Sequence, residues 1–168
     1  MREKPLKNLK KLIIRINFLY LLLIFCACKI EKFNEYKVYI APIVNKTSWV
    51  QLDTELFEYL HTFLNKFMHV ENSVEDTDIQ VYLTITQVQL VTPVSGRLDE
   101  PLFSEINVWG HIQLITKKTK YNFSIYESAP FVRGQEETIE YALERIYEKI
   151  GSRVYFSIAR VIKNDKKV

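Results

Sequence analysis

Glycine is scarce in this chain: only four of its 168 residues are glycines, and none lies near another. A phosphate-binding loop needs closely spaced glycines so that backbone N–H groups can approach an anion. Gly96, Gly110, Gly134 and Gly151 are each isolated. Nucleotide binding by a loop of this kind is therefore not expected.

Residues typical of catalytic and metal sites are also few. His61, His69 and His111 have no histidine four residues away and no cysteine beside them, so no metal-binding spacing is present. The sequence also lacks the Gly-x-Ser-x-Gly pattern of a nucleophile elbow. We therefore expect a non-enzymatic protein without a cofactor or metal. The alternative is an enzyme whose acids or histidines meet only in the folded chain, because such a site leaves no motif.

The positive charge of the chain is concentrated at its N-terminus. The formal net charge is +3, but residues 1–17 contribute +5 through six basic residues and Glu3. Without this segment the remaining chain has a net charge near −2. Sequence-independent nucleic-acid binding requires a basic surface, so the sequence argues against it.

The first 28 residues have the pattern of a bacterial lipoprotein signal. A basic start is followed by the apolar stretch Phe18 to Phe25 and then by Cys26-Ala27-Cys28. The apolar stretch is too short to cross a bilayer of about 30 Å, which favours cleavage over a permanent anchor helix. We predict a signal peptide over residues 1–27, a lipidated Cys28 with a tether over 28–36, and one domain over 37–168. The alternative is a membrane anchor in which both cysteines are ordinary apolar residues.

This interpretation leaves no free thiol in the folded domain, because Cys26 is removed and the sulfur of Cys28 carries lipid. A disulfide, a zinc–thiolate site and a cysteine nucleophile are then excluded. Lys29 follows the predicted lipidated residue, where aspartate would favour retention at the inner membrane. We therefore expect the protein at the periplasmic face of the outer membrane, anchored by lipid.

The first half of the predicted domain alternates between strand and helix patterns. A strand is expected over residues 36–43, followed by a turn at Asn45 to Ser48. From Leu52 to Met68 the apolar residues follow a helical period on a face that is unusually broad. This breadth fits either a wide core face or a contact with a partner. Residues 70–78 form a polar connection with room for a short edge strand.

The second half predicts three strands and a long helix. Residues 79–90 alternate with a period of two, but the phase shifts near Thr86 and Gln87, which predicts a β-bulge. After a loop over 91–103, strands are expected over 105–114 and 121–125, and a helix over 135–162. Gly151 inside this helix predicts a kink or a close packing contact. The resulting order, β-α-β-β-β-α, predicts an α+β two-layer sandwich with about four strands in a mixed or antiparallel sheet and two covering helices.

The signal, the run Tyr39-Ile40-Ala41-Pro42-Ile43-Val44-Asn45-Lys46-Thr47 and the helix after it resemble the opening of the lipopolysaccharide-assembly lipoproteins (LptE-like). The later strands and the closing helix follow the same order, so the resemblance covers nearly the whole mature chain. It implies that the protein sits in an outer-membrane β-barrel, supports assembly of this barrel and helps lipopolysaccharide, or an equivalent amphiphile, reach the outer leaflet.

The same resemblance implies an anion-binding set of basic residues at one end of the sheet. The candidates by position are Arg97, Arg133, Lys117, Lys118 and Lys120. Arginine suits phosphate contacts because its guanidinium can bond two oxygens at once. A competing hypothesis is a periplasmic lipoprotein that activates a cell-wall synthase or forms part of a secretion channel, because such proteins also show a strand, a Pro-x-x-Asn-x-Thr run and a helix.

Overall fold

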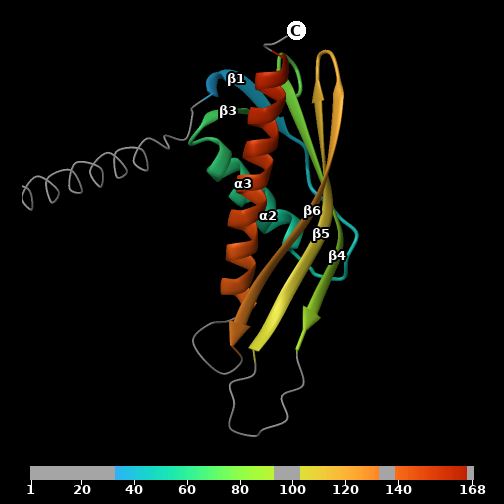
Figure 1. The fold of residues 1–168 in the computed structure, drawn as a ribbon. Coiled ribbons are helices and arrows are strands. Elements are labelled where there is room, and N and C mark those ends of the chain that lie inside the picture. Colours follow the sequence, from blue (N-terminus) through green and yellow to red (C-terminus); the bar gives the residue numbers. More distant parts are fainter. Residues whose placement is uncertain (1–32, 93–102, 133–138, 166–168) are drawn as a thin grey trace, which may run out of the picture. The chain divides into compact units, whose positions relative to one another are not determined.

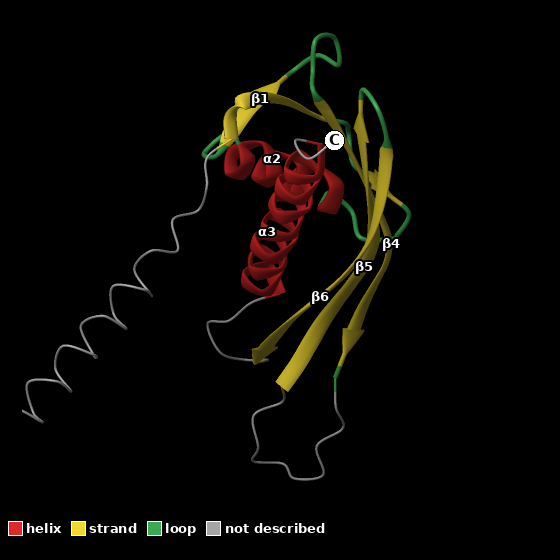
Figure 2. Cartoon of the chain, turned by 45° about the horizontal axis from the view of Figure 1, so that its top comes forward, coloured by secondary structure: helices red, strands yellow, loops and turns green. Residues whose placement is uncertain are grey.

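The computed structural model describes residues 33–92, 103–132 and 139–165, all within one compact unit, Phe33–Val168. It has an α+β architecture in which two helices cover one face of a mixed sheet (Figures 1 and 2). The predicted two-layer fold class is therefore confirmed. The elements are β1 (Phe33–Ile40), β2 (Val44–Asn45), α2 (Leu52–Leu64), β3 (Met68–Glu71), β4 (Ile79–Val91), β5 (Phe103–Thr116), β6 (Lys120–Val132) and α3 (Ile139–Asp165).

The sheet combines a parallel half with an antiparallel half. Its order is β3-β1-β4-β5-β6, with β2 paired to β4. The pairs of β1 with β3, β1 with β4 and β2 with β4 are parallel, whereas β4, β5 and β6 form an antiparallel meander. The three strands of the meander are those expected in the second half of the sequence, and they are the longest of the sheet.

The boundaries of several elements differ from those predicted. β1 begins at Phe33, whose side chain is buried, so the residues assigned to the end of the tether form a strand. α2 ends at Leu64, because the next segment turns to form β3 beside β1. β6 continues to Val132, seven residues beyond its expected end, because it pairs with β5 along nearly the full length of that strand. The expected first turn of the last helix, residues 135–138, lies outside the described residues.

The predicted β-bulge is present at Thr86. Ile85 is paired with Gly110 and Gln87 with Trp109, so Thr86 is the extra residue on β4. The four buried residues before the bulge and the partly buried Val88 and Leu90 after it keep to one face of the sheet, which requires the shift in phase seen in the sequence.

The core lies between this face and the two helices. Leu56, Leu60 and Leu64 of α2 are fully buried, as are Ile146 and Ile150 of α3. The predicted close contact at Gly151 is confirmed as well. A Cβ atom there would lie 3.0 Å from Tyr59 Cε1 and 3.2 Å from Phe63 Cδ1, so the glycine lets α3 approach the aromatic rings of α2.

Polar contacts fix both ends of the helical layer. The Tyr147 hydroxyl on α3 donates to Glu55 Oε2 on α2 at 2.9 Å, and burial, together with this bond, raises the pKa of Tyr147. The Tyr121 hydroxyl at the start of β6 donates to Asp165 Oδ1 at the end of α3 at 3.2 Å. These bonds hold α3 against α2 and against the edge of the sheet.

The Pro-x-x-Asn-x-Thr run forms the turn that leads into α2. Asn45 Oδ1 accepts hydrogen bonds from the backbone N–H of Thr47 at 3.0 Å and from its hydroxyl at 2.7 Å. The Asn45 amide donates to the Trp49 carbonyl at 2.7 Å. Asn45 and Thr47 therefore have a structural role, as turn-forming residues commonly do.

Candidate functional site

In the described part of the chain, no helix covers the face of the meander opposite α2 and α3 (Figure 2). We call it the open face. Its residues alternate along β4, β5 and β6 with the buried ones: Gln80, Tyr82, Thr84, Gln87, Gln89, Asn107, Trp109, His111, Gln113, Asn122, Ser124, Tyr126 and Ser128.

Over its central part the open face is polar and aromatic. Charged residues make up 26% of the whole chain, yet the residues named above include no Asp, Glu, Lys or Arg. The same alternation places Glu105 of β5 at one end of the face and Lys120 of β6 at the other. The centres of protein interfaces are likewise depleted in charged residues and enriched in tyrosine and tryptophan. The central part of this face therefore has the composition of a candidate docking surface.

Contacts between neighbouring side chains hold the open face in a defined arrangement. The rings of Trp109 and Tyr126 are 5.2 Å apart between centroids, and the Tyr126 hydroxyl donates to Asn107 Oδ1 at 2.9 Å. Gln113 Nε2 donates to Asn122 Oδ1 at 3.0 Å. Because these side chains order one another across β5 and β6, a partner that docks here loses less side-chain entropy.

A hollow of about 490 Å³ opens at the β2 side of this face. It is lined by Tyr82, Thr84, His111 and Gln113 from the sheet, and Lys46 after β2 contributes its cation. The hollow offers hydrogen-bonding groups and one positive charge, but it is shallow and open. It can accept a projecting polar group of a docked partner.

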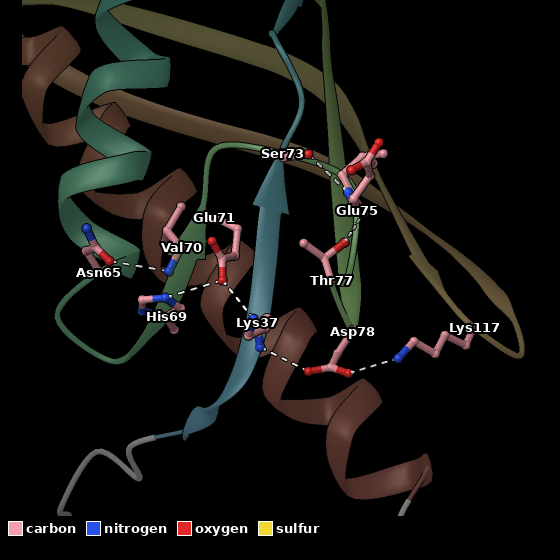
Figure 3. Close-up of polar contacts among 11 residues, drawn as sticks. Lys37, Asn65, His69, Val70, Glu71, Ser73, Glu75, Thr77, Asp78 and Lys117 are labelled. Atoms are coloured by element: carbon pink, nitrogen blue, oxygen red, sulfur yellow. Dashed lines mark hydrogen bonds and ion pairs between the residues drawn. The ribbon is translucent and has the colours of Figure 1, made fainter.

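The lysines predicted to bind anions lie at the turn between β5 and β6. Lys117 Nζ is 3.5 Å from Asp78 Oδ1 (Figure 3). The other carboxylate oxygen of Asp78, Oδ2, accepts a hydrogen bond from the backbone N–H of Lys37 at 3.1 Å. Lys118 and Lys120 are exposed and form no ion pair with another described residue. Part of the positive charge of Lys117 is therefore offset by Asp78, and the other two lysines remain available to an anion.

The charged contacts continue from Lys37 across the parallel half of the sheet. Lys37 Nζ is 3.1 Å from Glu71 Oε1, and His69 Nε2 is 3.3 Å from the same oxygen (Figure 3). These groups are about 30% to 60% exposed, so solvent weakens each pair. They link β1 to β3 on the surface and do not form an enclosed site.

Two of the candidate cations, Arg97 and Arg133, lie outside the described residues, so their part in an anion-binding set stays a prediction. Among the described candidates, Lys117 follows the end of β5 at Thr116, and Lys120 begins β6. The three lysines therefore share the turn that joins these two strands.

Sequence reasoning did not identify the open face as a site, although its residues were assigned to one side of the strands. The available signal was the lack of charge on alternate positions of three consecutive strands. It could not be recognised until the register across those strands was known.

None of the helices in the described residues is both long enough and apolar enough to span a bilayer. No group of three or more His, Cys, Asp or Glu residues in that part of the chain is arranged to hold a metal ion.

No protein-family pattern and no curated protein sequence matches the chain. Solved structures share its fold at low sequence identity. A protein from Xanthomonas campestris has a TM-score of 0.54 and 9% identity over 79% of this chain and 89% of its own. A putative neuraminyllactose-binding hemagglutinin homolog from Helicobacter pylori has a TM-score of 0.52 and 16% identity, covering 83% and 94%.

A hypothetical protein from Chlamydia trachomatis has a TM-score of 0.52 and 10% identity over 71% of this chain and 95% of its own. Bacterial lipoproteins are also among the matching structures, at TM-scores of 0.34 to 0.43, which are too low to support an argument about this chain. The comparisons therefore show a fold that this chain shares with proteins from several bacteria.

Proposed function

We propose that this protein is a non-enzymatic lipoprotein at the periplasmic face of the outer membrane. Its open face docks against a β-barrel translocon, supports assembly of that barrel and assists insertion of lipopolysaccharide or a related amphiphile. The observation that carries the proposal is the open face itself, which is polar, aromatic and internally hydrogen-bonded, and which has no Asp, Glu, Lys or Arg between Glu105 at one end and Lys120 at the other.

The chemistry of this face suits the inner wall of a transmembrane barrel. The strands of such barrels alternate between apolar residues facing lipid and polar residues facing the lumen. A flat array of amide, hydroxyl and aromatic groups can exchange hydrogen bonds with such a wall without burying unpaired charges, which would be costly. Tyr82, Trp109 and Tyr126 supply the rigid aromatic area that anchors many interfaces.

The signal pattern supports the location, because a lipid on Cys28 would hold the domain near the membrane in which a barrel resides. Lys118 and Lys120 provide exposed cations at one end of the meander, and Arg97 and Arg133 belong to segments that adjoin the other end. Either group can contact the phosphates of an amphiphile that passes along the sheet.

Site-specific photo-cross-linking in intact cells tests the docking surface. A photoreactive residue in place of Gln87, which is exposed on the open face, should cross-link to one outer-membrane protein whose electrophoretic mobility changes on heating, as folded barrels do. The matched control replaces Glu58, which is exposed on α2. It should give no such product, because the helical layer faces away from the barrel.

Equal cross-linking from both positions, or no barrel product from Gln87, would reject the proposal. A product that contains a cell-wall synthase, or a ring of identical subunits, would favour the alternative role instead. The Pro-x-x-Asn-x-Thr run does not favour that alternative, because Asn45 and Thr47 are accounted for by their turn.

A further inference from the structure

β6 forms one edge of the sheet. In the described part of the chain it pairs only with β5, along a strand of 13 residues. An exposed edge of this length offers a row of backbone N–H and C=O groups to any extended chain, and folded proteins usually protect such edges.

Half of this edge is protected by long side chains of α3. The Ser128 carbonyl accepts a hydrogen bond from Lys149 Nζ, and the Pro130 carbonyl accepts one from the Arg145 guanidinium. Pro130 also has no N–H group, which is why proline is tolerated at an edge position. From Ser128 to Val132 the strand therefore offers few free groups to a partner.

The other half is not protected in this way. Backbone groups in an antiparallel strand alternate between pointing to the partner strand and pointing away from it. Because Ser128 and Pro130 point outward and β6 pairs with β5 without a bulge, Asn122, Ser124 and Tyr126 also point outward. No described side chain forms a hydrogen bond with the outward backbone groups of Asn122 or Ser124.

A groove of about 880 Å³ runs beside this unprotected half, between β6 and α3. Phe123 and Ser124 line it on the strand side, and Ser152, Phe156 and Arg160 line it on the helix side. Phe156 is 63% exposed, which is unusual for so large an apolar side chain in the middle of a helix. The groove thus combines free backbone groups with an apolar contact.

The charges along the groove favour an acidic occupant. Its cations are Lys149, Arg153 and Arg160, and its acids are Glu127 and Glu148. Arg153 Nε is 2.5 Å from Glu127 Oε1, so these two charges offset each other. Arg160 is exposed and forms no ion pair with another residue of the described ranges, and it lies beside the unprotected half of the edge.

We propose that the edge of β6 from Asn122 to Tyr126 binds an extended acidic segment of a partner protein, which joins the sheet as an added strand. Backbone hydrogen bonds to Asn122 and Ser124 supply the affinity, and Phe156 and Arg160 select an apolar and an acidic side chain on the segment. A second copy of the chain fits less well, because self-pairing at this edge places two cationic helix faces side by side. The site goes beyond the proposed docking role, since it uses the edge of the sheet and not its open face.

The test uses the purified full chain in detergent and short synthetic peptides in which valine and glutamate alternate at every second position, with threonine between them, so that both side chains can face α3. Binding should slow hydrogen exchange in residues 120–126 but not in 128–132, as measured by mass spectrometry. A peptide with lysine in place of glutamate should bind at least about fivefold more weakly, as should the glutamate peptide with its central amide methylated. The methylated peptide keeps the charge and loses the hydrogen bond.

Two pairs of variants separate the contributions of backbone and charge. Ser124→Pro removes an outward N–H group and should lower affinity for the acidic peptide about tenfold, whereas Ser128→Pro, the same change in the protected half of the edge, should leave it unchanged. Arg160→Glu should lower that affinity about fivefold, whereas Lys66→Glu, an equal change of charge on an exposed residue beside β3, should not.

Several results would overturn the proposal. One is equal affinity for the acidic and basic peptides. Another is slower hydrogen exchange on peptide binding outside residues 120–126. Absence of binding at about 1 mM peptide would also do so, since strand addition with a matched charge should exceed that affinity. A concentration-dependent dimer that is lost in Ser124→Pro would assign the edge to a second copy of the chain instead. Loss of barrel cross-linking from Gln87 would reject the docking role without affecting this result.

Discussion

Replacing Gly110 by alanine tests the close approach of strands at the β-bulge. Gly110 lies on β5 opposite Ile85, directly beside the extra residue Thr86 on β4. A Cβ atom at Gly110 would lie 2.4 Å from the backbone oxygen of Thr84 and 3.3 Å from Ile85 Cδ1. The first distance is far below van der Waals contact, and the atom in the way belongs to the backbone, so β4 itself would have to move.

The free-energy cost of this clash is partly offset, because alanine is less flexible than glycine in the unfolded chain. Alanine in place of glycine within a strand favours folding by about 0.5–1 kcal/mol. Forcing an extra methyl group into a filled core typically costs about 1–3 kcal/mol, and a displaced backbone places this site at or above the upper end. We therefore expect Gly110→Ala to lower the free energy of unfolding by about 2 kcal/mol.

Gly151→Ala is the matched control, because it is also a buried glycine close to other atoms. There the added Cβ atom meets side-chain ring atoms of Tyr59 and Phe63 at 3.0 and 3.2 Å, and those rings are only partly buried and can shift. Alanine also favours a helix over glycine by about 1 kcal/mol. Its stability should therefore stay within about 1 kcal/mol of the original protein.

Urea unfolding monitored by tryptophan fluorescence measures the free energy of unfolding of both variants. Trp109, which adjoins Gly110 in the sequence, reports on this part of the sheet. If Gly110→Ala is as stable as the original protein, or less affected than Gly151→Ala, the account of the bulge is wrong.

Three further predictions concern the helical layer, the anchor and the cations. Tyr147→Phe should cost about 1 kcal/mol at neutral pH because the hydrogen bond to Glu55 is lost. The pKa of Tyr147 is raised on folding, so its stabilisation is present below the usual tyrosine pKa of about 10 and is lost above it; chemical unfolding of the variant should therefore depend less on pH in that alkaline range. Cys28→Ser should abolish palmitate labelling, and labelling that persists would reject the anchor. Arg97→Glu combined with Arg133→Glu should weaken lipopolysaccharide binding with the fold intact by circular dichroism, and unchanged binding would leave these arginines as ordinary solvated residues.

The antiparallel half of the sheet could be predicted because its information is local. Residues 79–90 alternate with a period of two, and the change of phase marks one extra residue, which the structure places at Thr86. The short turn between Thr116 and Lys120 then requires antiparallel strands, and successive strands usually lie side by side. Gly151 was also informative, since a glycine inside a long helix needs a reason such as close packing.

The parallel half could not be predicted in the same way. β1 lies between β3 and β4 and is parallel to both, and this order depends on α2, which carries the chain back before β3 begins. β3 has only four residues, too few for a clear period. The length of β6 was underestimated because its second half holds Ser128, Ala129 and Pro130, which have low strand propensity. Pairing with β5 and contacts from α3 keep that half extended.

The two proposed binding surfaces share residues, and this has a physical consequence. The side chains of Asn122 and Ser124 belong to the open face, while their outward backbone groups belong to the edge. An extended segment bound at the edge would add a strand beside β6 and widen the open face by the spacing of one strand, about 4.8 Å. A partner that docks on that face would then contact the added strand as well. Binding at the edge and docking on the face would therefore be coupled, and each would change the affinity of the other by the same factor.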